Sequence, residues 1–203
     1  MEFLVRKYYA VLIIMLFSSL MYSQRAKLNE VAPGFTLKDS FGKEHSISDY
    51  EGKIIVLEWI NFECPFVKKH YNSKNMQNLQ EKYTKEGIVW LAICSSAKNK
   101  QGNFSNEEIN SRSENLKAKY LAYLIDENGN VGKMYGAKTT PNMYIIDKGG
   151  KLVYAGAIDD KPSTDIEDIE SAKNYVSAAL DELLDGKEVS RQSSTPYGCS
   201  VKY

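Results

Sequence analysis

Two long apolar runs dominate the first half of the chain. The segments "KIIVLEWI" (residues 53–60) and "GIVWLAIC" (residues 87–94) are rich in β-branched residues, which is typical of strands buried on both faces of a sheet. The first run is followed by apolar residues at helical spacing from Pro65 to about Gly87. After the second run, Ser105 and Glu108 have the spacing of a capping box and predict the start of another helix. This order of strand, helix, strand and helix predicts a parallel sheet.

The second half of the chain predicts a hairpin and a closing helix. Residues 143–146 and 152–154 are joined through "DKGGK", whose two glycines suit a tight turn. The last long helix is expected to be capped by Thr164 and Glu167 and to end at Gly186. The whole order of elements predicts an α/β sheet with helices on both of its faces.

One domain is expected over residues 27–186, because no repeat, low-complexity tract or linker divides the chain. Two short extended stretches around residues 39–43 predict a β-hairpin near its start. A polar tail, residues 187–203, follows the last helix and carries Cys199. Besides this cysteine, the end of the tail carries aromatic residues.

The first 23 residues differ in kind from the rest. Arg6 and Lys7 precede an apolar centre, residues 10–17, that is shorter than the ~20 residues a spanning helix needs. We interpret residues 1–23 as a signal peptide that is cleaved after Ser23, with an uncleaved membrane anchor as the alternative. Export to a periplasmic or other extracytoplasmic compartment would place the protein where thiols persist only if they are reduced or used.

Composition and charge exclude some functions. Lys plus Arg and Asp plus Glu both total 26 and the isoelectric point is about 6.7, so no basic surface for nucleic acid is expected. Neither His45 nor His70 has a metal-ligand partner at a recognisable spacing, and no glycine-rich phosphate loop occurs. We therefore expect no metal and no cofactor. The sequence does not indicate an oligomeric state.

Cys64 is the first candidate for chemistry, because it lies where the strand over residues 53–60 gives way to a helix. Pro65 suits the first helical position, so Cys64 is expected beside the N-cap, where backbone N–H groups and the helix dipole stabilise a thiolate. Lys68 would assist this effect, and Glu63 would oppose it. The alternative is a buried structural cysteine.

Two segments resemble a known family. The stretch "NEVAPGFTLKDSFGKEHSISDYEGKIIVLEWINFECPFVK" is similar to the opening of redoxins, the alkyl hydroperoxide reductase and thiol-specific antioxidant group. The resemblance implies a thioredoxin-like fold with a central mixed sheet flanked by helices and an N-terminal β-hairpin extension. It also implies a thiol-dependent oxidoreductase in which Cys64 is the nucleophile. Glu63 replaces the family's tryptophan, and Val67 replaces the second, resolving cysteine.

The later segment "AKTTPNMYIIDKGGKLVYAGAIDD" resembles the part of this family that holds a cis-proline facing the nucleophile. Thr140 and Pro141 match that pair. The resemblance implies that the backbone of Thr140 pairs with an extended substrate or with a mixed-disulfide partner. Without the resemblance, these residues would indicate only a turn before a strand.

Glu58 interrupts the most hydrophobic strand and lies six residues before Cys64. Thioredoxin-like proteins carry at this spacing a buried acid that exchanges protons with the active-site thiols. The resemblance therefore implies that Glu58 is a proton acceptor whose pKa is raised by burial. An ordinary paired or edge-exposed glutamate is the alternative.

Cys199, in "TPYGCSVKY", resembles a C-terminal Gly-Cys element of some redoxin-like proteins. It would resolve oxidised Cys64 in place of the missing local cysteine, giving a disulfide. Cys94 ends an apolar strand and is interpreted as structural. Three cysteines still permit three pairings, and their spacing does not choose between Cys199 and Cys94 as the partner of Cys64.

The peroxide-binding residues of peroxiredoxins are absent, because Leu57 and Asn61 stand where that family has a proline and a threonine or serine. The sequence therefore leaves open slow peroxide reduction and thiol–disulfide exchange. The expected partners are a thioredoxin-like reductant, a thiol or disulfide substrate protein, and peroxide. A non-catalytic binding module on the same fold is the competing class.

Overall fold

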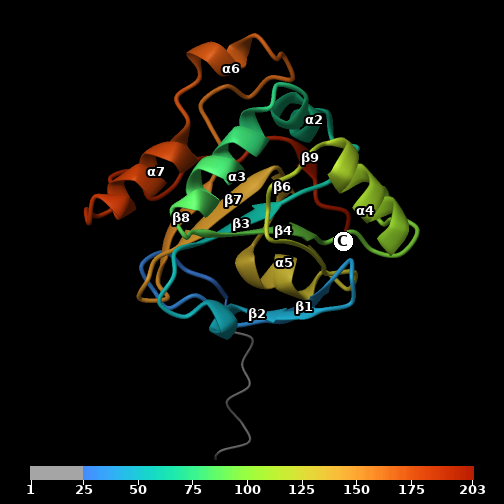
Figure 1. Ribbon diagram of the computed structural model, residues 1–203, viewed down its shortest axis with the longest axis horizontal. Coiled ribbons are helices and arrows are strands. Elements are labelled where there is room, and N and C mark those ends of the chain that lie inside the picture. The colour runs from blue at the N-terminus through green and yellow to red at the C-terminus, as the bar shows by residue number, and fades with distance from the viewer. Residues whose placement is uncertain (1–24) are drawn as a thin grey trace, which may run out of the picture.

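A computed structural model describes residues 25–203, and the expected signal peptide lies outside this part of the chain. Seven strands form one sheet in the order β2-β1-β5-β4-β3-β7-β8 (Figure 1). They are β1 (Thr36–Asp39), β2 (Glu44–Ser46), β3 (Ile55–Trp59), β4 (Val89–Cys94), β5 (Ala122–Ile125), β7 (Asn142–Ile146) and β8 (Leu152–Gly156). A separate two-stranded ladder joins β6 (Thr139–Thr140) to β9 (Cys199–Ser200).

The sheet is mixed. Strands β3, β4 and β5 are parallel, whereas β7 runs antiparallel to β3 and forms a hairpin with β8. Every residue of β3 and β4 is buried, which confirms the prediction made from their apolar runs. The hairpin of β1 and β2 near the start of the domain is also confirmed, and β1 extends the sheet by pairing with β5.

Helices cover both faces of the sheet, as predicted. They are α2 (Pro65–Asn72), α3 (Asn75–Lys85), α4 (Asn106–Asn115), α5 (Asn130–Tyr135), α6 (Asp168–Ser171) and α7 (Tyr175–Leu184), with a short 3₁₀ turn η1 (Ile47–Tyr50). Helices α2, α3 and α7 lie on one side of the sheet, and α5 lies on the other (Figure 1). Each side has its own apolar core, because alternate residues of β3 point in opposite directions.

The first predicted helix is interrupted. Lys74 adopts a left-handed conformation with φ 64°, so α2 ends at Asn72 and α3 begins at Asn75. The Ser73 hydroxyl accepts a hydrogen bond from the Asn75 backbone N–H, and the Asn75 side chain bonds to His70. These local polar contacts compete with helical backbone bonds, and the apolar spacing did not reveal them.

The closing helix begins later than predicted. Glu167 precedes only the four residues of α6, and the chain becomes extended again at Ala172. Helix α7 is capped instead by Asn174, whose side chain accepts a hydrogen bond from the Ser177 backbone N–H at 2.8 Å. The prediction of one continuous helix capped by Thr164 and Glu167 was therefore wrong, because Asn174 supplies the stronger N-cap.

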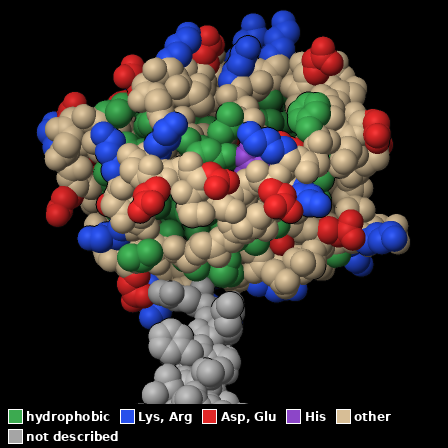
Figure 2. All heavy atoms as spheres, turned by 60° about the horizontal axis from the view of Figure 1, so that its bottom comes forward, with side chains coloured by type: hydrophobic (Ala, Val, Ile, Leu, Met, Phe, Trp, Pro, Cys, Tyr) green, Lys and Arg blue, Asp and Glu red, His purple; other side chains and the backbone are tan. Residues whose placement is uncertain are grey.

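The surface agrees with the neutral composition. Acidic and basic side chains are interspersed on the face that carries the β1–β2 hairpin, with no large area of one sign (Figure 2). Among residues 25–203, no helix is long and apolar enough to cross a membrane.

Candidate active site

Cys64 is the N-cap of α2, and Pro65 occupies the first helical position as expected. The loop that carries Cys64 from β3 is held by Asn61. The side-chain oxygen of Asn61 accepts from the Glu63 N–H at 2.9 Å, and its backbone oxygen accepts from the Cys64 N–H at 3.0 Å. The thiol is therefore fixed at the carboxyl end of β3, where functional groups of α/β sheets collect.

Thr140 meets Cys64 across the fold. The Cys64 thiol lies 2.9 Å from the Thr140 carbonyl oxygen, although the two residues are 76 positions apart. The peptide bond between Thr140 and Pro141 is cis, as the resemblance implied. The two segments singled out from the sequence thus come together at one place.

The third cysteine reaches the same place from the C-terminus. Strand β9 runs antiparallel to β6, with Cys199 opposite Thr140 and Ser200 opposite Thr139. Gly198 has φ 130° and packs so tightly on Thr140 that a Cβ there would clash with the Thr140 carbonyl oxygen. A glycine before Cys199 is therefore what allows the tail to approach Thr140 closely.

The surroundings shift the pKa values of the two thiols in opposite directions. Burial raises the pKa of Cys64, but hydrogen bonding from the Cys199 thiol, the Thr140 hydroxyl and backbone N–H groups outweighs burial and leaves it below its usual value. One of these N–H groups belongs to Val67, in the first turn of α2. Burial and the hydrogen bond to Cys64 raise the pKa of Cys199 to about 11. The arrangement favours a thiolate at Cys64 and a proton on Cys199.

The three cysteines differ in access. Cys64 is 0% exposed, whereas Cys199 is partly exposed. Cys94 lies at the end of β4, where its thiol donates to the Ser96 hydroxyl and to the Gly102 carbonyl oxygen, and burial raises its pKa. These contacts support the interpretation of Cys94 as structural.

Glu58 is completely buried and accepts three hydrogen bonds. The donors are the Tyr71 hydroxyl at 2.9 Å, the Gln80 amide at 3.0 Å and the Trp90 indole N–H at 2.8 Å. Burial raises the pKa of Glu58 to about 7, although these three bonds oppose the shift. The exposed-glutamate alternative is excluded, and a carboxyl group that titrates near neutral pH lies inside the core beneath α2 and α3.

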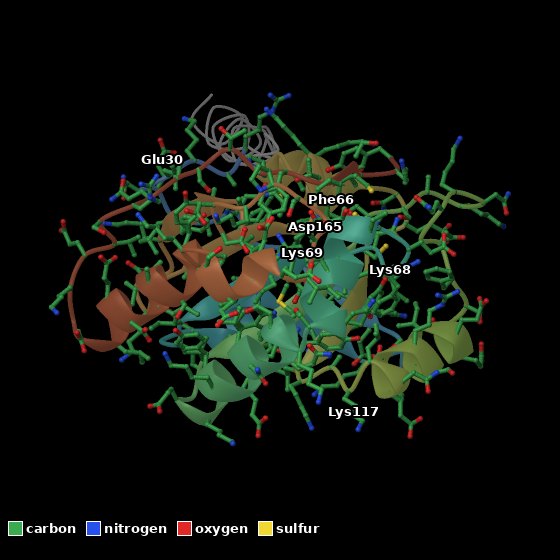
Figure 3. All side chains as sticks on the ribbon, turned by 90° about the horizontal axis from the view of Figure 1, so that it is seen from above. Glu30, Phe66, Lys68, Lys69, Lys117 and Asp165 are labelled. Carbon is green, nitrogen blue, oxygen red and sulfur yellow. The ribbon has the colours of Figure 1, made fainter. Side chains whose placement is uncertain are left out.

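Sequence analysis missed a polar cluster that holds the tail. Tyr197, two residues before Cys199, donates through its hydroxyl to Asp159 at 2.5 Å and lies 3.2 Å from the His70 Nε2. Its ring packs on Phe66, which Figure 3 shows on α2. His70, which sequence analysis considered as a metal ligand, contacts the segment that carries Cys199. Only the tail aromatics in the sequence hinted at this anchoring.

The structure also shows where the charged neighbours of Cys64 and the polar loop after β4 lie. Lys68, labelled in Figure 3, is exposed on α2. Glu63 forms an ion pair with Arg112 at 3.9 Å. The polar loop after β4 borders the site, since the Gln101 carbonyl oxygen accepts from the Asn61 side chain at 3.3 Å. Within residues 25–203, no group of three His, Cys, Asp or Glu side chains is arranged to hold a metal.

Residues 28–155 match the model of the AhpC/TSA family, a range that includes Cys64, Thr140 and Pro141. The chain belongs to the AhpC/TSA family. Thiol-disulfide oxidoreductase ResA of Bacillus thuringiensis is 25% identical over 133 residues, which cover 64% of this chain and 69% of ResA. Probable glutathione peroxidase 5 of Arabidopsis thaliana is 31% identical over 90 residues, covering 44% of this chain and 51% of the relative.

Solved structures confirm the expected fold. An uncharacterized conserved protein from Geobacillus kaustophilus superposes with a TM-score of 0.73 and 31% identity, covering 87% of this chain and 92% of that protein. A putative thioredoxin from Neisseria meningitidis superposes with a TM-score of 0.51 and 20% identity over 63% of this chain and 79% of its own. The fold is thioredoxin-like. The family and its relatives also confirm the prediction of a thiol-dependent oxidoreductase. A non-catalytic binding module is not favoured.

Replacing Glu58 with glutamine should change how stability depends on pH. The folded state keeps the Glu58 proton up to about pH 7, whereas an unfolded chain releases it near pH 4.5. Raising the pH across this window therefore destabilises the wild type by roughly 3 kcal/mol relative to Glu58→Gln, with no further change above it. Urea unfolding at a series of pH values checks this; a constant difference would show that Glu58 does not titrate there.

Replacing Thr140 with valine should raise the pKa of Cys64. The Thr140 hydroxyl is buried and has no hydrogen-bond partner in the described part of the chain, so it is free to donate to the Cys64 thiolate, whose pKa it lowers. The expected result is a higher pH midpoint for alkylation of Cys64, followed by peptide mass spectrometry, with the fold retained. Thr139→Val, at the neighbouring residue of β6, is the matched control. An unchanged midpoint in Thr140→Val would show that the hydroxyl does not act on the thiol.

Proposed function

We propose that the protein is a two-cysteine thiol oxidoreductase in which Cys64 is the nucleophile and Cys199 is the resolving thiol. The observation that carries this proposal is the register of β9, which sets Cys199 opposite Thr140 while Thr140 contacts Cys64. The opposite pKa shifts of the two thiols support it, because one thiol is prepared to attack and the other keeps its proton.

In disulfide exchange, the Cys64 thiolate attacks one sulfur of a substrate disulfide, and the other substrate sulfur leaves as a thiolate. Cys199 loses its proton and attacks the Cys64 sulfur of this mixed disulfide. The second substrate thiolate leaves, and a Cys64–Cys199 disulfide forms. The substrate has then gained two electrons that the protein dithiol has lost, and an external dithiol must restore the protein.

Disulfide exchange is better supported than peroxide reduction. Asn61 stands where peroxiredoxins have a threonine or serine, and its side chain bonds to the Gln101 carbonyl oxygen and the Glu63 N–H. The Arg112 guanidinium pairs with Glu63. Leu57 packs in the apolar core on the α5 side of the sheet. These contacts engage the Asn61 and Arg112 side chains elsewhere, so neither is positioned to donate to a peroxide oxygen. Slow peroxide reduction remains the second function, with Cys64 oxidised to a sulfenic acid and Cys199 condensing with it to release water.

Other residues have supporting roles in this proposal. The backbone of Thr140, with Pro141, pairs with an extended substrate segment, since its edge already accepts a β-strand. Glu58 exchanges protons with the thiols, supported by its pKa of about 7 and by its burial. Because its carboxylate bonds are made to Tyr71, Gln80 and Trp90, proton transfer to Cys64 requires an intervening group. No cofactor is needed.

The proposed partners are a protein that carries a disulfide and a thioredoxin-like dithiol protein that regenerates the reduced form. The names of the relatives support a thiol or disulfide partner. We also propose that the mature protein acts outside the cytoplasm. The basic and apolar pattern of residues 1–23 supports export, and an oxidising compartment would supply disulfides.

Oxidation of the reduced protein should link Cys64 to Cys199. Separate incubations with excess oxidised glutathione and with one equivalent of hydrogen peroxide should both produce this disulfide in intact and peptide mass spectra, more slowly with peroxide. Cys94→Ser is the control and should behave as the wild type. In Cys199→Ser, Cys64 should accumulate as the glutathione adduct or the sulfenic acid. A Cys64–Cys94 disulfide, or unreacted Cys64, would contradict the proposal.

A further inference from the structure

In the reduced protein the C-terminal segment covers the nucleophile. Cys64 is 0% exposed and Thr140 is 3% exposed, and the strand that lies against Thr140 is β9 of the same chain. A substrate protein that pairs with the Thr140 backbone needs the edge that β9 already occupies. The tail and a substrate strand therefore exclude one another.

The covering segment begins after a fixed point. Ser193 bridges to Ala155, and the Ser194 hydroxyl bonds to the Tyr154 hydroxyl at 2.7 Å and accepts from the Ala157 N–H at 2.9 Å. These contacts attach the chain to β8 and the turn that follows it. The C-terminal strap, defined here as residues 195–203, can leave its site without any movement of α7.

The C-terminal strap is held mainly at its two ends. Tyr197 anchors one end through Asp159, His70 and Phe66. Tyr203 anchors the other, since its hydroxyl donates to the Ala137 carbonyl oxygen at 2.7 Å and its ring covers Gly129 and Gly132 at α5.

Between these anchors, the strap makes few backbone contacts. Strand β9 has only two residues, and beyond it the Val201 N–H bonds to the Lys138 carbonyl oxygen at 3.1 Å. The Lys202 carbonyl oxygen accepts from the Ala97 N–H at 2.8 Å. Segments with so few backbone bonds open locally at a small free-energy cost.

We propose that the C-terminal strap is a displaceable occupant of the substrate edge, and that a disulfide-bearing partner protein binds by adding its own extended segment to Thr139 and Thr140 in its place. This inference rests on the proposed function. The strap leaves, the partner strand pairs with β6, and Cys64 attacks the partner disulfide. The returning strap brings Cys199 to the mixed disulfide and takes back the edge, so resolution and release of the reduced partner occur together.

The strap also indicates which segment the edge accepts. In the strap, glycine precedes the cysteine and an aromatic residue stands two positions before it, filling a site against Phe66. A side chain at the glycine position would clash with the Thr140 carbonyl oxygen in this register. The preferred partner segment is therefore extended, with a small residue before its reactive cysteine and an aromatic residue before that.

Gly198→Ala tests the strap without removing a thiol, because its Cβ would push β9 away from Thr140. The reaction is followed in a Cys199→Ser background, in which the mixed disulfide between Cys64 and insulin accumulates and is measured by mass spectrometry. With Gly198→Ala we expect the mixed disulfide to form about tenfold faster, because the rate is proportional to the fraction of molecules in which the C-terminal strap has left β6. The matched control is Gly150→Ala, another positive-φ glycine with no atom near its Cβ position, and it should leave the rate unchanged.

Tyr203→Ala provides a second route, since it removes the far anchor and leaves Gly198 and β6 intact. It should also accelerate the insulin reaction. Equal rates in all these variants, with Cys64 reactive, would overturn the strap proposal and leave the proposed function standing. If Cys64 formed no adduct with insulin or oxidised glutathione in any variant, the proposed function would fail and the strap proposal with it.

Discussion

The site depends on the register between β6 and β9. Successive residues of a strand point to opposite sides, so a slip of one residue would turn the Cys199 side chain away from Cys64. Two features fix the pairing: Gly198 packs against the Thr140 carbonyl oxygen, and the Val201 N–H bonds to Lys138. The two-residue ladder of β6 and β9 thus brings the C-terminal segment to Cys64, which lies between β3 and α2.

This register also sets the electrostatics. Cys64 is buried, which by itself disfavours a thiolate, yet the Cys199 thiol and N–H groups reverse the balance. Burial and the hydrogen bond to Cys64 raise the pKa of Cys199 to about 11, so Cys199 holds its proton more tightly than Cys64 does. Glu58 adds a second buried group that titrates near pH 7 in the core beneath the helices.

Much of this arrangement follows from the sequence. The apolar runs predicted β3 and β4, and the cysteine between strand and Pro65 predicted the N-cap at Cys64. The resemblance, not the pattern, located Thr140 and Pro141. The meeting of the tail with Thr140 could not be derived, because periodicity carries no information about contacts between distant segments. The break at Lys74 was missed for a different reason: a single left-handed residue leaves the apolar spacing on both sides intact.

The most direct test of the account is a redox titration of the intact protein in glutathione buffers of defined potential, read by intact mass and peptide mapping. If Cys64 and Cys199 form one redox couple, they should be oxidised together in a single two-electron transition that yields the internal disulfide. Cys94 should stay reduced throughout. Separate glutathione adducts on Cys64 and Cys199, appearing at different potentials without an internal disulfide, would contradict the account.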